Sequence, residues 1–277
     1  MQTAPALPGP LVVTALLARR ELLARLASAW FWIIASLICV IAWIYGGGFQ
    51  QTFVTESVLV ATDPLLTLNV LIVMFLSVAM ALRLAASFAG EREHRTLEVL
   101  LVGPASWGSI MAAKFLAELS LMVLLILVYL AYLLVAQPLG AGVIAPRDAL
   151  GLIAMPAFAL PVLALGLLVA AWARTVRAAV VAVTAVLGAL AAFEAGLGLL
   201  QSRAPDQITL TELQIRSALE TAAPLSAWLS APGQLAGLAR ALAQNAAPSA
   251  TAALWSLGLT AGTLCLATLL ARLRGPA

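Results

Sequence analysis

Histidine, lysine and cysteine, which serve many enzyme active sites, are scarce in this 277-residue sequence: it has one histidine, one lysine and two cysteines. An HExxH zinc motif needs two histidines, so metalloproteases of that class are excluded. A phosphate-binding GK[ST] loop is excluded because the single lysine, Lys114, follows Ala113 and precedes Phe115. No GxSxG segment carries a serine nucleophile. We therefore expect no catalytic centre, metal site or bound cofactor, and energy must come from a partner or an ion gradient.

Charge is scarce as well. Charged residues make up 10% of the chain and hydrophobic residues 63%, whereas about a quarter of the residues in soluble proteins are charged. The composition therefore predicts an integral membrane protein. The net charge of +3 does not indicate nucleic acid, because the arginines flank apolar runs instead of forming a patch. Cys39 and Cys265 each lie inside an apolar run and are expected to be free thiols.

The apolar runs predict an all-α protein with six transmembrane helices in one membrane domain, residues 1–277. Runs long enough to cross a bilayer occur at residues 30–45, 65–82, 115–136, 150–172, 178–200 and 252–270. Residues 11–29 mix leucines with arginines, a pattern typical of an amphipathic helix at the membrane interface or of an extension of the first span into the cytoplasm. The long connection 201–251 is expected to be extracytoplasmic, with short helices at Leu210–Glu220 and Gln234–Ala243.

The distribution of basic residues predicts the orientation of these spans. With the N-terminus in the cytoplasm, eleven of the fifteen basic residues lie on the cytoplasmic side. Basic residues are enriched in cytoplasmic loops of membrane proteins. We therefore expect both termini, and the loop at 83–114, in the cytoplasm.

Prolines and glycines inside the predicted spans suggest how the helices pack. Pro156 and Pro161 are expected to bend the fourth span and to free carbonyl groups that neighbouring helices must satisfy. Small residues at four-residue spacing allow close helix approach, within or between subunits. Such candidates in the last two spans are Gly188, Gly196, Gly258 and Gly262.

Two glutamates are candidates for a polar function within the membrane. Glu118 lies one helical turn after Lys114 and is expected to pair with it at the cytoplasmic edge. Glu194 lies near the outer end of the fifth span, facing a cavity or interfacial water. Ionisable residues in a membrane are often functional, but interfacial anchoring explains both positions equally well.

Residues 83–114 form the one charge-dense island of the chain. Glu91, Arg92, Glu93, His94, Arg95 and Glu98 fall within eight positions. Leu97, Leu100 and Leu101 follow at helical spacing, which predicts a short helix with an apolar stripe that ends at Gly103-Pro104. Such a helix can dock in a groove of another protein, or the segment is a solvated loop that only enforces topology.

The island also carries a recognisable order of residues. Its parts are Glu91-Arg92, then Arg95-Thr96-Leu97-Glu98-Val99-Leu100-Leu101, then Pro104-Ala105-Ser106 and Lys114-Phe115-Leu116-Ala117. This order resembles the cytoplasmic loop of ABC-2 type transporter permeases, most closely the branch of gliding-motility and nitrous-oxide-reductase accessory permeases. Two positions depart from that pattern: Arg95 stands where the family commonly has glycine, and Ala105 replaces a bulkier residue.

The resemblance implies the membrane subunit of an ABC transporter, which is not itself an enzyme. It implies a bacterial cytoplasmic-membrane permease that pairs with a second permease subunit and with two cytoplasmic ABC ATPase subunits. ATP would bind the partner and drive transport, most simply export, of an unidentified substrate. The coupling contacts implied are Glu91, Arg92, Arg95, Leu97, Glu98, Leu100, Leu101 and Pro104. Glu91 and Glu98 would be the charged contacts, and the three leucines the docking face.

The residues alone leave two other functions open. A gradient-driven carrier or channel would use an intramembrane carboxylate, and Glu194 is the best candidate for it. A non-transporting scaffold of a membrane biogenesis complex would also suit six apolar helices.

Overall fold

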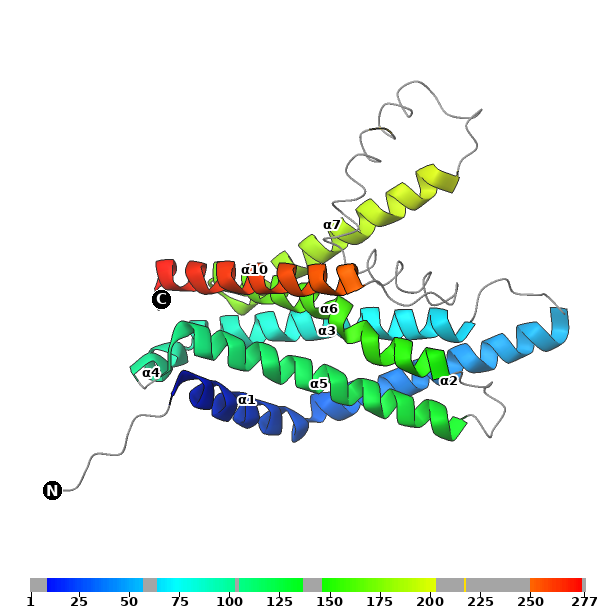
Figure 1. The fold of residues 1–277 in the computed structure, drawn as a ribbon, viewed down its shortest axis with the longest axis horizontal. Coiled ribbons are helices and arrows are strands. Elements are labelled where there is room, and N and C mark those ends of the chain that lie inside the picture. The colour runs from blue at the N-terminus through cyan, green and yellow to red at the C-terminus, as the bar shows by residue number, and fades with distance from the viewer. Residues whose placement is uncertain are drawn as a thin grey trace.

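A computed structural model describes residues 9–56, 64–102, 105–136, 146–202, 217 and 250–275. The two short helices expected between 201 and 251, and Pro104, lie outside the described residues apart from single positions. All regular structure in the described ranges is helical (Figure 1). The helices are α1 (Pro10–Leu26), α2 (Ala29–Glu56), α3 (Pro64–Glu93), α4 (Thr96–Val102), α5 (Trp107–Ala136), α6 (Pro146–Trp172), α7 (Val176–Ser202) and α10 (Ala250–Arg274).

The predicted all-helical membrane fold is confirmed. Five helices, α3, α5, α6, α7 and α10, are long and apolar enough to cross a bilayer. A sixth span is counted if α1 and α2 are taken together, although these two helices are bent by 65° at Ala27 and Ser28. The bend lets α1 lie along α5 while α2 continues away from it (Figure 1). Both cysteines are free thiols.

The charged island differs from the expected loop, because most of it is helical. Helix α3 continues to Glu93 and α5 already begins at Trp107, so that only residues 94–106 connect them. Arg95 ends α3 in the left-handed conformation with φ of 57°, which glycine adopts most readily. In the loop pattern that the island resembles, glycine is common at this position. Thr96 Oγ1 donates a hydrogen bond to Glu91 O at 3.0 Å and satisfies one carbonyl of the helix end.

Helix α6 occupies the centre of the bundle. It packs against both α3 and α10, and α3 also packs against α7. In the most apolar stretch of α6, 67% of the residues are buried inside the chain. The corresponding shares are 11% for α7 and 17% for α10. The outward faces of α7 and α10 are therefore available to lipid or to another subunit.

A close helix contact involves a glycine that the sequence pattern did not single out. A Cβ atom built on Gly166 of α6 would lie 2.6 Å from Ala81 O of α3, far inside normal contact distance. By contrast, a Cβ atom on any of the four candidates, Gly188, Gly196, Gly258 and Gly262, meets nothing within 4 Å. Those four glycines do not mediate packing among the described helices, so a packing role for them would involve another subunit.

One of the two prolines inside α6, Pro161, leaves a carbonyl group that another helix satisfies, as expected from the sequence. Pro161 has no N–H group, so the carbonyl of Ala157, four residues earlier, loses its helical hydrogen bond. Ser256 Oγ of α10 donates a hydrogen bond to Ala157 O at 2.7 Å. The expectation that a neighbouring helix satisfies the freed carbonyl is therefore confirmed for Pro161.

Replacing Ser256 by Ala should destabilise the α6–α10 contact by about 0.5–2 kcal/mol, the range measured for hydrogen bonds between membrane helices. In a Pro161→Ala background the restored N–H group bonds Ala157 O itself, so the same Ser256→Ala change should cost less. The measurement is a double-mutant cycle from reversible unfolding in mixed micelles. Equal costs in both backgrounds would contradict the assignment of this hydrogen bond to the proline break.

Candidate functional site: helix α4 and the buried ionic network beside it

Helix α4 lies at one end of the bundle. The same end holds the beginning of α1, the end of α3, the beginning of α5 and the C-terminal end of α10 (Figure 1). Helix α4 lies between α3 and α5 in the chain, so it is linked to two long helices.

The apolar stripe predicted for α4 is present, but it faces the protein itself. Leu97 is only 1% exposed, and Leu100 and Leu101 are half-buried against the core. The outward side carries Val99 and Val102, which are 75% and 90% exposed. In the structure these three leucines fasten α4 to its own bundle, so the docking role predicted for them stays a prediction, and the side of α4 left exposed is the opposite one.

The outward side of α4 is mixed in character. Glu98 is exposed beside the two valines, and His94 and Arg95 are exposed in the turn that precedes the helix. The two highly exposed valines, flanked by ionisable side chains, form a small apolar surface with a polar rim. This combination is typical of the core and rim of a protein interface. We refer to Glu98, Val99 and Val102 as the outer face of α4.

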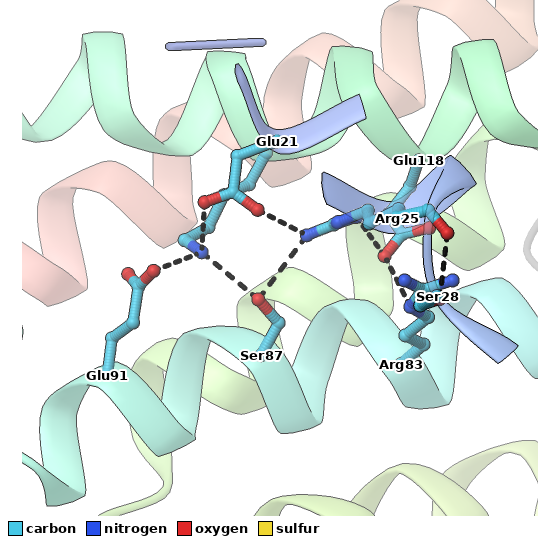
Figure 2. A network of polar contacts seen from close by, with 8 residues as sticks. Glu21, Arg25, Ser28, Arg83, Ser87, Glu91 and Glu118 are labelled. Carbon is cyan, nitrogen blue, oxygen red and sulfur yellow. Dashed lines mark hydrogen bonds and ion pairs between the residues drawn. The ribbon is translucent and has the colours of Figure 1, made fainter. Parts of the chain in front are cut away.

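A network of polar side chains joins three helices next to α4 (Figure 2). It contains three acidic and three basic side chains, with a serine between them, so its formal charges balance. The members are Glu21 and Arg25 of α1, Arg83, Ser87 and Glu91 of α3, and Lys114 and Glu118 of α5. Balanced ion pairs are the condition under which charges are tolerated in an apolar interior.

Glu118 is the most deeply buried member, with a side chain that is 0% exposed. Its carboxylate is paired with the Arg25 guanidinium, and Arg83 Nε lies 3.8 Å from the same oxygen. The expected Glu118–Lys114 pair does not form. These residues lie one turn apart on α5, but each is opposed by nearer groups of opposite charge on α1 and α3, which take precedence over the helical neighbour.

Lys114 is held instead by α3 and α1. Its Nζ donates to Glu91 Oε1 at 2.7 Å and to Ser87 Oγ at 3.0 Å, and lies 3.7 Å from Glu21 Oε1. The lysine is 3% exposed and so is almost fully enclosed by these partners. Glu91, predicted as a contact for a partner protein, is therefore engaged within the chain.

Ser87 connects the two halves of the network. Its Oγ accepts hydrogen bonds from Lys114 Nζ at 3.0 Å and from Arg25 Nη2 at 3.3 Å. Arg25 also pairs with Glu21 at 3.2 Å, one turn earlier on α1. Arg83 completes the arrangement by lying over the ring of Trp30, 4.1 Å from its centroid, a cation–π contact. Helices α1, α3 and α5 are thereby fixed to each other at this level of the bundle.

The last turn of α3 makes contacts that sequence reasoning assigned to a partner. Arg92 is 6% exposed and donates to Ala171 O at 3.1 Å and to Gly275 O at 3.2 Å. The guanidinium predicted to contact another protein is thus hydrogen-bonded inside the chain, and its contact with a partner stays a prediction. Glu93, which was not singled out, accepts a hydrogen bond from Val176 N at 3.0 Å and so caps the start of α7.

The remaining candidate, Glu194, lies half-buried on α7, a helix that contributes no residue to the network. Glu21, Arg25 and Ser87 were not predicted from the sequence patterns. Their signal was available only in part: Glu21 and Arg25 are four residues apart and share one face of α1, but nothing in the pattern says that this face meets α5.

The site joins helices and offers no reactive group. In the described ranges, no three His, Cys, Asp or Glu residues lie together so as to hold a metal ion. What the geometry provides is a small exposed surface on α4, and a set of buried ion pairs that bind α1, α3 and α5. The apolar helices and these ion pairs define a polytopic membrane protein.

The chain belongs to the ABC-2 family transporter proteins, whose family profile matches residues 15–272. It is thus the membrane subunit of an ABC transporter, in a family that works with an ATP-binding subunit. No curated protein matches the chain.

Proposed function

We propose that this protein is an ABC-2 permease that exports a substrate across the bacterial cytoplasmic membrane, powered by ATP bound to separate ATPase subunits. Two permease subunits and two ATPase subunits would form the complex, with both termini and α4 in the cytoplasm. The bias of eleven basic residues to four supports that orientation. The observation that carries the proposal is the outer face of α4, an apolar and charged surface on a helix that connects two spans.

The coupling would use α3 and α5 as continuous rods. Each has 30 residues, or roughly 45 Å at the rise of an α-helix, which is enough to cross the bilayer. A push on the outer face of α4 that is passed to α3 or α5 is then carried to the far end of that helix. The ionic network adds α1 to the moving unit, because Arg25 and Glu21 hold α5 and α3.

The substrate path would form between two permease subunits. The outward faces of α7 and α10 support such a path, since most residues in the apolar stretches of these two helices are not buried by the chain itself. Gly188, Gly196, Gly258 and Gly262 lie on these two helices with open space around their Cα atoms, so that a second subunit can approach closely.

Introducing charge on the outer face of α4 tests the proposed partner contact. Val99→Asp with Val102→Asp should abolish co-purification of the ATPase subunit, since two buried carboxylates without partners oppose association. Both valines are exposed in the free subunit, so insertion and thermal stability should stay unchanged. The measurement is affinity purification of the tagged permease from its native host, with the ATPase quantified by mass spectrometry.

The matched control is Arg174→Asp. Arg174 is exposed in the turn between α6 and α7 and, like the α4 variant, it receives a new carboxylate at a surface position. The control should retain the ATPase. Retention of the ATPase by the α4 double variant would refute coupling through this face, and loss in both variants would show that the effect is not specific to α4.

A further inference from the structure

Three consecutive charged residues end α3, and each contacts a different helix. Residues along an α-helix are offset by about 100°, so the side chains of three neighbours spread over more than half the helix circumference. Glu91 binds Lys114 of α5, Arg92 binds carbonyl groups of α6 and of the segment after α10, and Glu93 caps α7. Every one of these contacts originates within five residues of the start of α4.

Arg92 connects α3 to two segments that are far from it in the sequence. Its Nη1 donates to Ala171 O, 79 residues away, and its Nη2 to Gly275 O, 183 residues away. Ala171 belongs to the last turn of α6, where carbonyl groups lack helical partners and carry the negative end of the helix dipole. Gly275 follows α10 with φ of +66°, a conformation that only glycine adopts without strain.

A second arginine, Arg274 at the end of α10, binds the end of α6. Arg274 Nη1 donates to Trp172 O, and its guanidinium lies 5.5 Å from the centroid of the Trp172 ring. The ends of α6 and α10 are therefore tied to each other by Arg274 and to α3 by Arg92. The two ties differ in exposure, because Arg92 is buried while Arg274 is exposed.

We infer that Arg92 is a positioning residue that fixes the base of α4 to the C-terminal ends of α6 and α10, so that these three parts move together. The inference rests on the proposed function for its role in transport, where Arg92 would pass a displacement of α4 to α6 and α10. The anchoring itself is independent of any partner. A planar guanidinium with a fixed fork of donors suits two carbonyl groups at once, whereas a lysine ammonium lacks that geometry.

The anchoring is tested by pulsed electron paramagnetic resonance on the full-length protein in nanodiscs. Spin labels are attached through His94→Cys in the turn that begins α4 and Leu273→Cys on α10, two exposed positions outside the outer face of α4, in a Cys39→Ala, Cys265→Ala background. With Arg92 present, the distance distribution should be narrow. Arg92→Gln should broaden it and shift it to longer distances, Arg92→Lys should give an intermediate result, and the exposed-residue control Arg174→Gln should leave it unchanged.

Thermal unfolding of each variant separates positioning from stability, and Arg92→Lys serves as the test variant if Arg92→Gln does not fold. A distribution as narrow in the Arg92 variants as in the parent would overturn the inference. So would an equal broadening in Arg174→Gln.

The role in transport is measured on the complex with the co-purified ATPase, before and after trapping with ADP and vanadate. The label distance should stay constant on trapping when Arg92 is present and should change in the Arg92 variant. A distance that changes on trapping with Arg92 in place would refute the joint movement. Absence of any bound ATPase would instead contradict the proposed function, while the measurement without a partner still decides the anchoring.

Discussion

Replacing Glu118 by Ala is expected to destabilise the protein by about 3–5 kcal/mol, the usual cost of removing one partner from a buried ion pair. The change leaves Arg25, which is 5% exposed, and Arg83 without the carboxylate that lies between them. An unpaired charge in an apolar interior costs far more than the lost attraction alone. The expected result is a large fall in the unfolding midpoint of the purified protein, measured by thermal unfolding in detergent micelles.

A double variant distinguishes charge imbalance from loss of packing. Arg25→Leu combined with Glu118→Leu removes one charge of each sign, so Glu21, Arg83, Glu91 and Lys114 remain balanced. It should recover much of the stability that Glu118→Ala loses. Glu98→Ala removes an exposed carboxylate and should leave the midpoint unchanged. A Glu118→Ala protein as stable as the parent would contradict the network as drawn from the structure.

The second large effect is expected at the crossing of α3 and α6. Gly166→Ala places a methyl group 2.6 Å from the backbone oxygen of Ala81. Backbone cannot move aside as a flexible side chain can, so the helices have to separate, at a cost of about 1–3 kcal/mol typical of overpacking. Gly166→Leu should cost more, because a larger side chain pushes α6, the central helix, further from its neighbour.

Gly262→Ala on α10 is the matched control, since a Cβ atom there meets nothing within 4 Å. Alanine is favoured over glycine inside a helix by roughly 0.5–1 kcal/mol. The same glycine-to-alanine change should therefore destabilise at Gly166 and be neutral or slightly stabilising at Gly262. The check is reversible unfolding of both variants in mixed micelles, and a similar effect of the two changes would refute the close contact at Gly166.

Local patterns were sufficient where one physical requirement determined the outcome. A span must be apolar over the thickness of a bilayer, so the helices in the described ranges follow the apolar runs. A proline lacks an N–H group, so the need for another donor at Ala157 followed directly from Pro161. The stripe of Leu97, Leu100 and Leu101 was likewise correct as a stripe, because helical spacing puts these residues on one face.

Patterns were insufficient wherever the answer depended on which helix lies opposite. Leu97, Leu100 and Leu101 cover the chain's own core, although the same spacing suits a docking face for another protein. Arg92 is exposed in an isolated helix end but buried once α6 and α10 end beside it. Gly166 and Gly262 are both glycines inside apolar helices, and the sequence does not distinguish them. Only the path of α3, which passes close to Gly166, makes a glycine necessary there.

The sequence by itself determined the class of the protein, because hydrophobicity, the scarcity of charge and the residue order of the island do not depend on long-range contacts. It also identified the segment at residues 83–114 in which most of the polar contacts were later found. The tertiary structure alone decided the roles within that segment. Its main contacts join residues that are 23 to 183 positions apart in the sequence. These contacts pair Lys114 with Glu91, Glu118 with Arg25, and Arg92 with two helix ends. Only the packing of the helices brings such residues together.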